Sequence, residues 1–482
     1  MEDIKETTRI MDEKELSQYE KLILTPIKKL IPKLAIPTVI SMMITMIYNL
    51  VDAFFVGKIG TSASASTGIL LSVQAIFQAV GFMFGHGSGS NISVQLGMGK
   101  RNEANKIAAL GFFSAIVVSI VPMFFGLIFI DDFMRALGST ETILPYARSY
   151  GFYILISGPA LTLSCILNNI IRYEGKAFFA MIGLVSGGVL NMFFDPIFMF
   201  GLNMGIHGAG LSTAISQYIS LGILYYMFWS KKTITEIKFC NFEWNTVRFC
   251  RIIKNGLPSL IRQSLNSVST MTLNICAMPY GDSAIAAMAI VGRVAMFIGS
   301  TMVGIGQGFQ PVSAFNYGAK KYKRIRKAFW FTFFIGEGVL GIMAITGMFF
   351  PAEIVRVFRN DDKVVEIGRI TLMYQCVAII AQPMSIVTNM LFQSIGKSKI
   401  ASFTAALRSG ICYIPTLIIL PKFIGLTGVE CAQMISDIMT TLICLPFTVY
   451  FFARLPRKDE EVELDRQYMV SKEKMYYNKS ES

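Results

Sequence analysis

Long apolar segments recur along the chain at nearly regular spacing, and short polar connections separate them. Most of these segments exceed the roughly 18 residues that make a stretch a candidate membrane span. In lipid each one must be helical, because its backbone groups find no water to bond. The pattern predicts twelve transmembrane helices, over approximately 34–56, 64–96, 104–130, 143–172, 178–200, 209–229, 252–278, 284–315, 327–350, 364–394, 399–420 and 428–452.

Composition supports an integral membrane protein. Of the 482 residues, 53% are hydrophobic and 16% are charged, and the mean hydropathy is +0.53. Soluble domains carry about 25% charged residues. The eight cysteines form no CxxC pair, and the only histidines are His86 and His207. We therefore expect no metal site, no disulfide framework and no bound cofactor.

The distribution of charge predicts the orientation. With the amino terminus in the cytosol, the cytosolic loops would hold 19 Lys and Arg residues and the opposite loops 8. Because positively charged loops stay on the cytosolic side, we expect a multi-pass protein of the cell membrane (inner or plasma) with both termini in the cytosol. This effect also accounts for the net charge of +13 without a nucleic-acid partner. The charged first 33 residues lack the features of a secretory signal peptide.

A shift of 221 residues superposes the two halves of the sequence. Each half holds six predicted spans, an even number, so the repeat is parallel and its axis lies along the membrane normal. We expect an all-α membrane fold of two pseudo-symmetric six-helix bundles, in which rocking of one lobe against the other gives alternating access. Matching residues include Pro37 with Pro258, Gly85 with Gly306, Arg135 with Arg356, and Asn168 with Asn389.

The repeat also sets the expected domain organisation. The loop at 230–254 is the only long link between the halves, so it marks the natural boundary of the lobes. The expected parts are a cytosolic tail (1–33), an amino-terminal lobe (34–229), a cytosolic linker (230–250), a carboxy-terminal lobe (251–452) and a second cytosolic tail (453–482).

Acidic residues within the predicted spans are the first candidates for function. Asp52 lies late in the first span, where an acid costs roughly 2.5–3.5 kcal/mol on insertion scales. Such an acid is expected to face a cavity and to carry a proton or a cation. The alternative is a structural carboxylate that bonds to a neighbouring helix near the interface.

The fifth span carries a second polar group. Asn191 and Asp195 stand four residues apart, on one face of the helix. Pro196 frees the carbonyl of Met192 near that face, and Thr213 on the sixth span could add a hydroxyl. These groups predict an oxygen-rich pocket, although Asn191 and Asp195 could instead serve only to bond helices together.

Other residues within the spans are candidates for the cavity or for ion pairs. Gln74 and Gln78 are polar at membrane depth, and Met46 precedes Asp52 on the first span, so these three could line a substrate cavity. Charges in the second half could either pair with one another, for instance Arg408 or Arg293 with Asp437, or mark a substrate pathway. This second set comprises Arg262, Arg293, Glu337, Arg408 and Asp437.

Several co-linear stretches resemble one family of transporters. They are "PTVISMMITMIYNLVDAFFVGKIG" at 37–60, "GHGSGSNISVQLGMGKRNEA" at 85–104, "NNIIRYEGK" at 168–176, "NMFFDPIFMFGLNMGIHGAGLSTAIS" at 191–216 and "PVSAFNYGAKKYKRIRKA" at 311–328. Together they resemble the multidrug and toxic compound extrusion (MATE) family, over about residues 30–452 and most closely its MepA-like branch.

The resemblance implies roles for particular residues. In relatives whose amino-terminal lobe carries the coupling site, that site maps onto Asp52, Asn191, Asp195 and Thr213. By the same resemblance, Tyr150 and Asn168 line the same cavity and Pro37 takes part in bending of the first helix. NorM-like members also carry acids on the seventh and tenth helices. The corresponding stretches here, 257–277 and 372–392, contain none, so a NorM-type ion site is not expected.

These observations favour a secondary antiporter that exports amphipathic, often cationic, organic compounds against inflow of protons or sodium. The resemblance suggests a monomer, and the sequence leaves the choice of ion open. No G-x-x-x-x-G-K-[ST] motif for ATP and no catalytic constellation is present, so an enzyme is not expected. The alternatives are a flippase for lipid-linked precursors from the wider superfamily, and a non-transporting membrane receptor.

Overall fold

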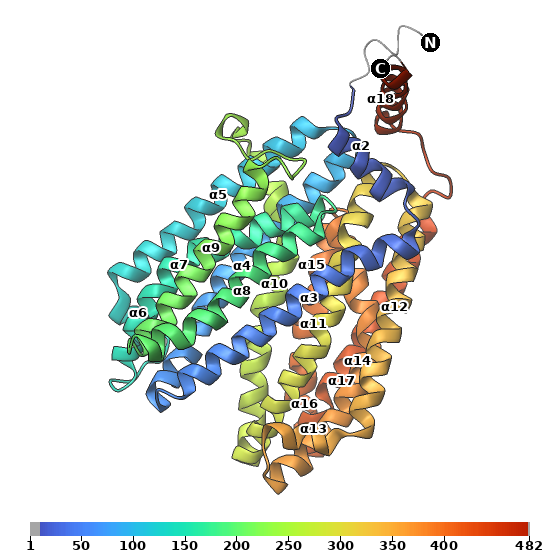
Figure 1. Cartoon of the computed structure of the whole chain (residues 1–482). Coiled ribbons are helices and arrows are strands. Elements are labelled where there is room, and N and C mark those ends of the chain that lie inside the picture. The colour runs from blue at the N-terminus through green and yellow to red at the C-terminus, as the bar shows by residue number, and fades with distance from the viewer. Residues whose placement is uncertain (1–9, 481–482) are drawn as a thin grey trace.

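The computed structural model describes residues 10–480, and these residues form helices almost throughout, without a strand. Figure 1 shows two helical bundles side by side, one coloured blue to green and the other yellow to red. The first helix described, α2 (Glu13–Tyr19), and the last, α18 (Glu463–Ser480), lie at the same end of the molecule. We call this the terminal end, and the opposite one the far end.

The amino-terminal bundle contains the six helices that the apolar pattern predicts. Two short elements, α6 (Ile130–Ala136) and the π-helical turn η2 (Ile197–Gly201), join them at the far end. The first span starts earlier than predicted because the helix is uninterrupted through Pro32. The long helices are α3 (Ile27–Gly57), α4 (Thr61–Gly97), α5 (Arg101–Ile128), α7 (Leu144–Tyr173), α8 (Ala177–Pro196) and α9 (Ile206–Trp229).

The carboxy-terminal bundle repeats this arrangement. Its eleventh predicted span is divided into α15 (Ser398–Ala406), the π-helical turn η5 (Leu407–Ile411) and α16 (Tyr413–Ile424), and the short α13 (Pro351–Phe358) corresponds to α6. The remaining helices are α10 (Thr246–Ala277), α11 (Asp282–Gly318), α12 (Tyr322–Phe349), α14 (Asp362–Ser394) and α17 (Leu426–Arg454).

Ten of the helices described are long and apolar enough to cross a membrane. The other two members of the bundles, α9 and α10, fall short of that criterion. Polar Ser, Thr and Gln residues lower the hydropathy of α9, and α10 carries Arg, Lys and Asn residues in addition. Both nevertheless pack against other helices, α9 against α7 and α8, and α10 against α15 of its own bundle and α4 of the other. The predicted fold of twelve helices in two lobes is therefore confirmed.

The internal repeat is visible in matched elements. Helices α4 and α11 each have 37 residues, and α5 and α12 each have 28, at the same offset of 221. Side-chain contacts repeat as well. The Asn168 amide donates to the Ala180 carbonyl at 2.7 Å, and Asn389 donates to Ala401 at 2.7 Å. In both lobes, therefore, the same asparagine-to-carbonyl hydrogen bond joins neighbouring helices.

The two lobes meet through close backbone contacts in the terminal half of the molecule. A Cβ added to Gly256 on α10 would lie 1.9 Å from the Met83 carbonyl oxygen on α4, and one added to Gly97 would lie 2.2 Å from the Phe315 carbonyl oxygen on α11. Such approaches are possible only for glycine. We call this contact, formed by α4 with α10 and α11, the seam.

Helix α3 crosses from one lobe to the other. In its first half Thr38 donates to the Gly304 carbonyl on α11 at 2.7 Å, and Ala35 packs closely on Gly308. In its second half Tyr48 packs on Gly188 of α8, in the amino-terminal lobe. One continuous helix therefore contacts the opposite lobe near the terminal end and its own lobe near the far end.

Beyond the seam the facing surfaces of the lobes are uncovered. On α10, Ser259 bonds to His86 of α4 at 2.9 Å, whereas Asn266, two turns further along the same face, is exposed. On α11, Gly304 packs on α3, whereas Arg293, three turns earlier on the same face, is exposed. The contacts between the lobes therefore end before the far end, where polar side chains on the same helix faces are exposed.

The seam generates a first prediction. Gly256→Ala would place a methyl group against the Met83 carbonyl, so the lobes must separate locally or the helix must shift. We expect thermal unfolding in detergent to report a loss of about 1–3 kcal/mol, as for overpacked interiors. Gly292→Ala is the matched control, because a Cβ there meets nothing within 4 Å. Equal stability of the two variants would contradict a tight seam.

Candidate functional site

The candidate coupling residues lie in the far half of the amino-terminal lobe. Asp52 is near the far end of α3, and Asp195 is in the last turn of α8, directly before Pro196. Asp195 is fully buried, and Asn191, one turn earlier on α8, is also buried. The spacing of four residues places both side chains on the face of α8 that packs on α9.

Asn191 is the centre of the hydrogen bonds in this site. Its amide donates to Asp195 Oδ1 at 3.3 Å, to Ser212 Oγ at 3.2 Å and to Thr213 Oγ1 at 3.4 Å. Ser212 Oγ in turn donates to the Asn191 carbonyl at 3.2 Å. The structure therefore brings together three residues that the sequence analysis selected, Asn191, Asp195 and Thr213, from two adjacent helices.

Asp52 joins this group from α3. Its charge acts on Asp195 and on the buried Tyr150 of α7, and Tyr150 lies beside Thr213. Asp52 Oδ1 and Asp195 Oδ2 are both buried without a hydrogen-bond partner among the residues described. Buried polar atoms normally find a partner. Two carboxylate oxygens left open at one place can accept a proton or coordinate a hard cation, which prefers oxygen ligands.

Sequence reasoning missed two residues of this site. Ser212 precedes Thr213 and takes the shorter bond from Asn191, but no spacing rule separates it from the other hydroxyls of α9. Tyr48 lies one turn before Asp52 on α3, and the charge of Asp52 acts on its hydroxyl group. Its spacing of four residues from Asp52 could have identified it, because residues four apart share one face of a helix.

The other predicted cavity residues are placed as follows. Asn168 is buried, and its side-chain amide donates to the Ala180 carbonyl, a hydrogen bond that joins α7 to α8. Gln74 and Gln78 on α4 and Met46 on α3 are half-buried. Pro37 lies within the continuous α3, and its carbonyl accepts from Ser41 at 2.9 Å. Their proposed roles in substrate binding and bending stay predictions.

In the carboxy-terminal lobe the buried acid Asp437 has a basic partner. Arg408 Nε lies 3.1 Å from Asp437 Oδ1, and the side-chain amides of Gln382 and Gln433 donate to the same carboxylate at 3.2 and 3.0 Å. Arg262 donates to Asn389 Oδ1 at 3.3 Å. Arg293 is exposed on α11 and Glu337 is half-buried on α12. Of the pairings considered from the sequence, the structure forms Arg408 with Asp437.

One buried arginine was not singled out in the sequence analysis, where it is the last residue of the fourth predicted span. Arg172 lies in the last turn of α7 and is 1% exposed. It donates to the Gln307 carbonyl and to Gln310 Oε1 on α11, each at 2.9 Å, and also to Asn169. Arg172 is therefore a cross-lobe contact at the seam. Its charge gave no sign of this, because arginine at a helix end is typical of cytosolic loops.

Comparisons with known proteins agree with this architecture. The family model described as MatE matches residues 37–197 and 258–419, two ranges whose starts are 221 residues apart. Multidrug export protein MepA of Staphylococcus aureus (strain MRSA252) is 26% identical over 441 residues, which are 90% of this chain and 96% of the relative. The protein of the same name from Staphylococcus haemolyticus (strain JCSC1435) is 25% identical over 442 residues, covering 91% and 96%.

Solved structures share the fold. A crystal structure of MATE in complex with MaL6 has a TM-score of 0.87 and 23% identity, covering 93% of this chain and 100% of that chain. Crystal structures of MATE in the straight and the bent conformation have TM-scores of 0.86 and 0.84 at 22% identity, each covering 93% of this chain and 100% and 99% of the other.

The two-lobe membrane fold and the multidrug export relatives together define this protein as a membrane transporter and not an enzyme. The chain belongs to the MatE family, because the family model matches more than half of its residues.

The ion pair of the carboxy-terminal lobe provides a second prediction. Arg408→Met leaves the Asp437 carboxylate buried without its cation, so we expect a loss of about 3–5 kcal/mol in thermal unfolding. The double variant Arg408→Met with Asp437→Leu removes both charges and should recover most of that stability. If the single variant is as stable as the wild type, the pair does not serve a structural role.

Proposed function

We propose that this protein is a multidrug efflux antiporter, which exports amphipathic and cationic organic compounds by alternating access, coupled to inward flow of protons or sodium. The observation that carries the proposal is the pair of open oxygens on Asp52 and Asp195, both within one lobe of a two-lobe transporter. The names of the relatives, multidrug export proteins, support the substrate class.

The acid pair supplies the means of exchange. Buried carboxylates attract a cation strongly because the surroundings have a low dielectric constant. A cationic substrate and a coupling ion then compete for the same negative charge, since bringing two cations together in an apolar site is unfavourable. Entry of a proton or sodium ion at Asp52 and Asp195 would release the substrate, and loss of that ion on the other side would restore the site.

Helix α3 is suited to transmit this change. Asp52 lies in its far half, Pro37 interrupts its hydrogen-bond ladder, and its terminal half packs on α11 of the other lobe. A change of charge at Asp52 could alter the bend at Pro37, and with it the contact between lobes. Relatives solved in straight and bent conformations are consistent with two shapes of the molecule.

We further propose that the terminal end faces the cytosol, so that the protein is a monomer in the cell membrane with an outward-open cleft. The excess of Lys and Arg in the loops at that end supports this orientation. The partners in this proposal are drug-like small molecules and the surrounding lipid.

Efflux from vesicles tests the coupling. We expect Asp52→Asn to abolish export of a fluorescent cationic dye, because the amide cannot exchange a proton or neutralise a cation, while the protein stays folded and membrane-inserted. The matched control is Asp132→Asn, which removes an exposed carboxylate on α6. Dye efflux at the wild-type rate in the Asp52→Asn variant would defeat the proposed mechanism.

The same vesicles identify the ion. An inward proton gradient and an inward sodium gradient are imposed separately on wild-type protein, and we expect only one of them to drive dye efflux. Since Asp195 has an open oxygen of its own, Asp195→Asn should lower efflux driven by the effective ion and leave the ineffective one unchanged. Efflux in the absence of any ion gradient would contradict antiport.

A further inference from the structure

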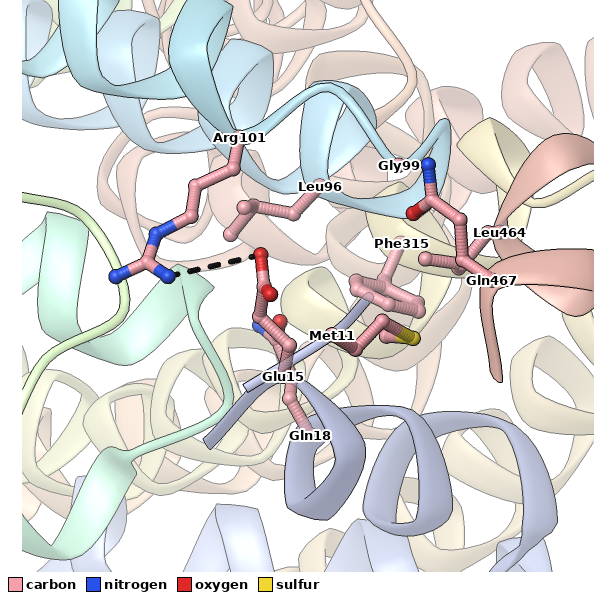
Figure 2. Close-up of a pocket in the computed structure, with 9 residues that line it drawn as sticks. All are labelled: Met11, Glu15, Gln18, Leu96, Gly99, Arg101, Phe315, Leu464 and Gln467. Carbon is pink, nitrogen blue, oxygen red and sulfur yellow. Dashed lines mark ion pairs between the residues drawn. The ribbon is translucent and has the colours of Figure 1, made fainter. Parts of the chain in front are cut away.

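Residues 11–25 and helix α18 cover the seam from outside the bundles. Figure 2 shows residues from four separate parts of the molecule around one small cavity at the terminal end. Gly99, at the turn between α4 and α5, lies against the side chain of Gln467 on α18. The residues around this cavity are Met11, Glu15 and Gln18 of the first segment, Leu96, Gly99 and Arg101 of the amino-terminal lobe, Phe315 of α11, and Leu464 and Gln467 of α18.

The first segment, residues 11–25, comprises α2 and the π-helical turn η1 (Glu20–Leu24). It is bonded to the amino-terminal lobe along its length. Arg101 Nη1 of α5 lies 2.6 Å from Asp12 Oδ2 and 3.8 Å from Glu15 Oε1. The Gln18 amide donates to the Glu174 carbonyl at 3.0 Å, and Lys21 donates to the Gly175 carbonyl at 2.6 Å.

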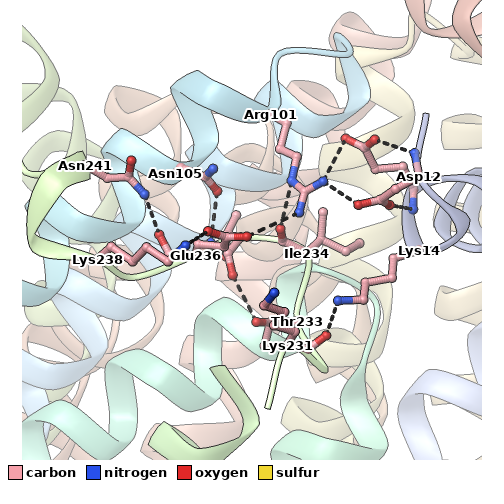
Figure 3. A network of polar contacts seen from close by, with 12 residues as sticks. Asp12, Lys14, Arg101, Asn105, Lys231, Thr233, Ile234, Glu236, Lys238 and Asn241 are labelled. Carbon is pink, nitrogen blue, oxygen red and sulfur yellow. Dashed lines mark hydrogen bonds and ion pairs between the residues drawn. The ribbon is translucent and has the colours of Figure 1, made fainter. Parts of the chain in front are cut away.

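Arg101 also ties the linker between the lobes to this segment. Its Nε donates to the Ile234 carbonyl at 3.1 Å, and Figure 3 shows its guanidinium between Asp12 and the linker residues Ile234 and Glu236. Lys14 reaches the Lys231 carbonyl on the same side. The segment is therefore held to the amino-terminal lobe by charged contacts that do not depend on the seam.

The same segment is bonded to the opposite lobe at the next residue. Arg324 of α12 donates to the Leu22 carbonyl at 3.1 Å and to the Thr25 carbonyl at 2.8 Å. Asn316 of α11 also donates to the Leu22 carbonyl, at 3.2 Å, and its Oδ1 accepts from Arg324. Lys21 and Leu22 are consecutive, yet they bond to opposite lobes. Separation of the lobes at this end must therefore break one of the two sets of bonds.

Helix α18 reinforces the attachment to the carboxy-terminal lobe. The Asp465 carboxylate accepts a hydrogen bond from the Tyr19 hydroxyl of α2 at 2.6 Å. It also forms an ion pair at 2.9 Å with Lys321, the residue directly before α12. The rings of Tyr19 and Tyr468 stack with centroids 4.2 Å apart. Burial beside Asp465 raises the pKa of the Tyr19 hydroxyl, which stays protonated as a donor. Residues 11–25 and α18 thus form one unit, which we call the clasp.

We propose that the clasp is a conformational lock, which holds the terminal ends of the lobes together while the cleft is open at the far end and must release the carboxy-terminal lobe before the terminal end can open. This inference rests on the alternating-access part of the proposed function and on no particular substrate or ion. Arg324 is the central positioning residue, since among the residues described it makes two of the three hydrogen bonds from that lobe to the first segment.

A pair of spin labels across the terminal end measures the lock directly. Asn102 on α5 and Lys399 on α15 are exposed on opposite lobes, and labelled cysteines there report the separation of the lobes by pulsed electron resonance in lipid nanodiscs. The exposed Cys240 and Cys250 are first replaced by serine. No substrate or gradient is added, so the measurement does not depend on whether export is observed.

We expect Arg324→Ala to increase the population with a separated terminal end about tenfold, as for the loss of a hydrogen bond from a charged donor. Arg324→Lys should give an intermediate shift, because it keeps the charge. The matched control is Lys327→Ala, an exposed charge one turn further along α12, and it should leave the distances unchanged.

Asp465→Ala is a second variant, outside the membrane helices, which breaks the contacts with Tyr19 and Lys321. It should shift the distances in the same direction. If both variants unfold at lower temperature but keep wild-type distances, the clasp is only a structural staple and the proposal is overturned. Changed distances together with failed dye efflux in the wild type would instead reject the proposed substrate or ion and leave the lock intact.

Discussion

The electrostatic demand of two carboxylates within an apolar helical bundle shapes the rest of this molecule. Asp52 and Asp195 each keep a buried oxygen without a donor. A charge placed there is tolerable only if water or a cation can reach it. The proposed exchange therefore requires a route from water to the pair, and Asp195 is fully buried in the state described.

The lobes share a backbone and differ in electrostatics. Both use an asparagine at the same repeat position to join neighbouring helices, Asn168 in one lobe and Asn389 in the other. In the carboxy-terminal lobe Asp437 pairs with Arg408 and accepts hydrogen bonds from two glutamines. Among the residues described, no basic side chain pairs with Asp52 or Asp195. Duplication explains the common frame, and the difference in charge distinguishes the two lobes.

Most of the fold could be predicted from the sequence because hydrophobic periodicity and the repeat act over long, regular stretches. The grouping of Asn191, Asp195 and Thr213 followed from helical spacing and the family resemblance. Ser212 and Arg172 were missed because nothing in the local sequence distinguishes them from their neighbours. The clasp was also beyond prediction, since Met11 and Ser471 are bonded across almost the whole chain and such pairing leaves no periodic signal.

The seam has a further consequence for how such a protein can change over time. Its closest contacts join glycine to main-chain carbonyl groups, so they make almost no demand on side-chain identity elsewhere. Surfaces away from the seam can therefore acquire new shapes and polarities without disturbing these contacts. Such a joint would let one scaffold diversify its cargo while the attachment of its lobes stays inherited.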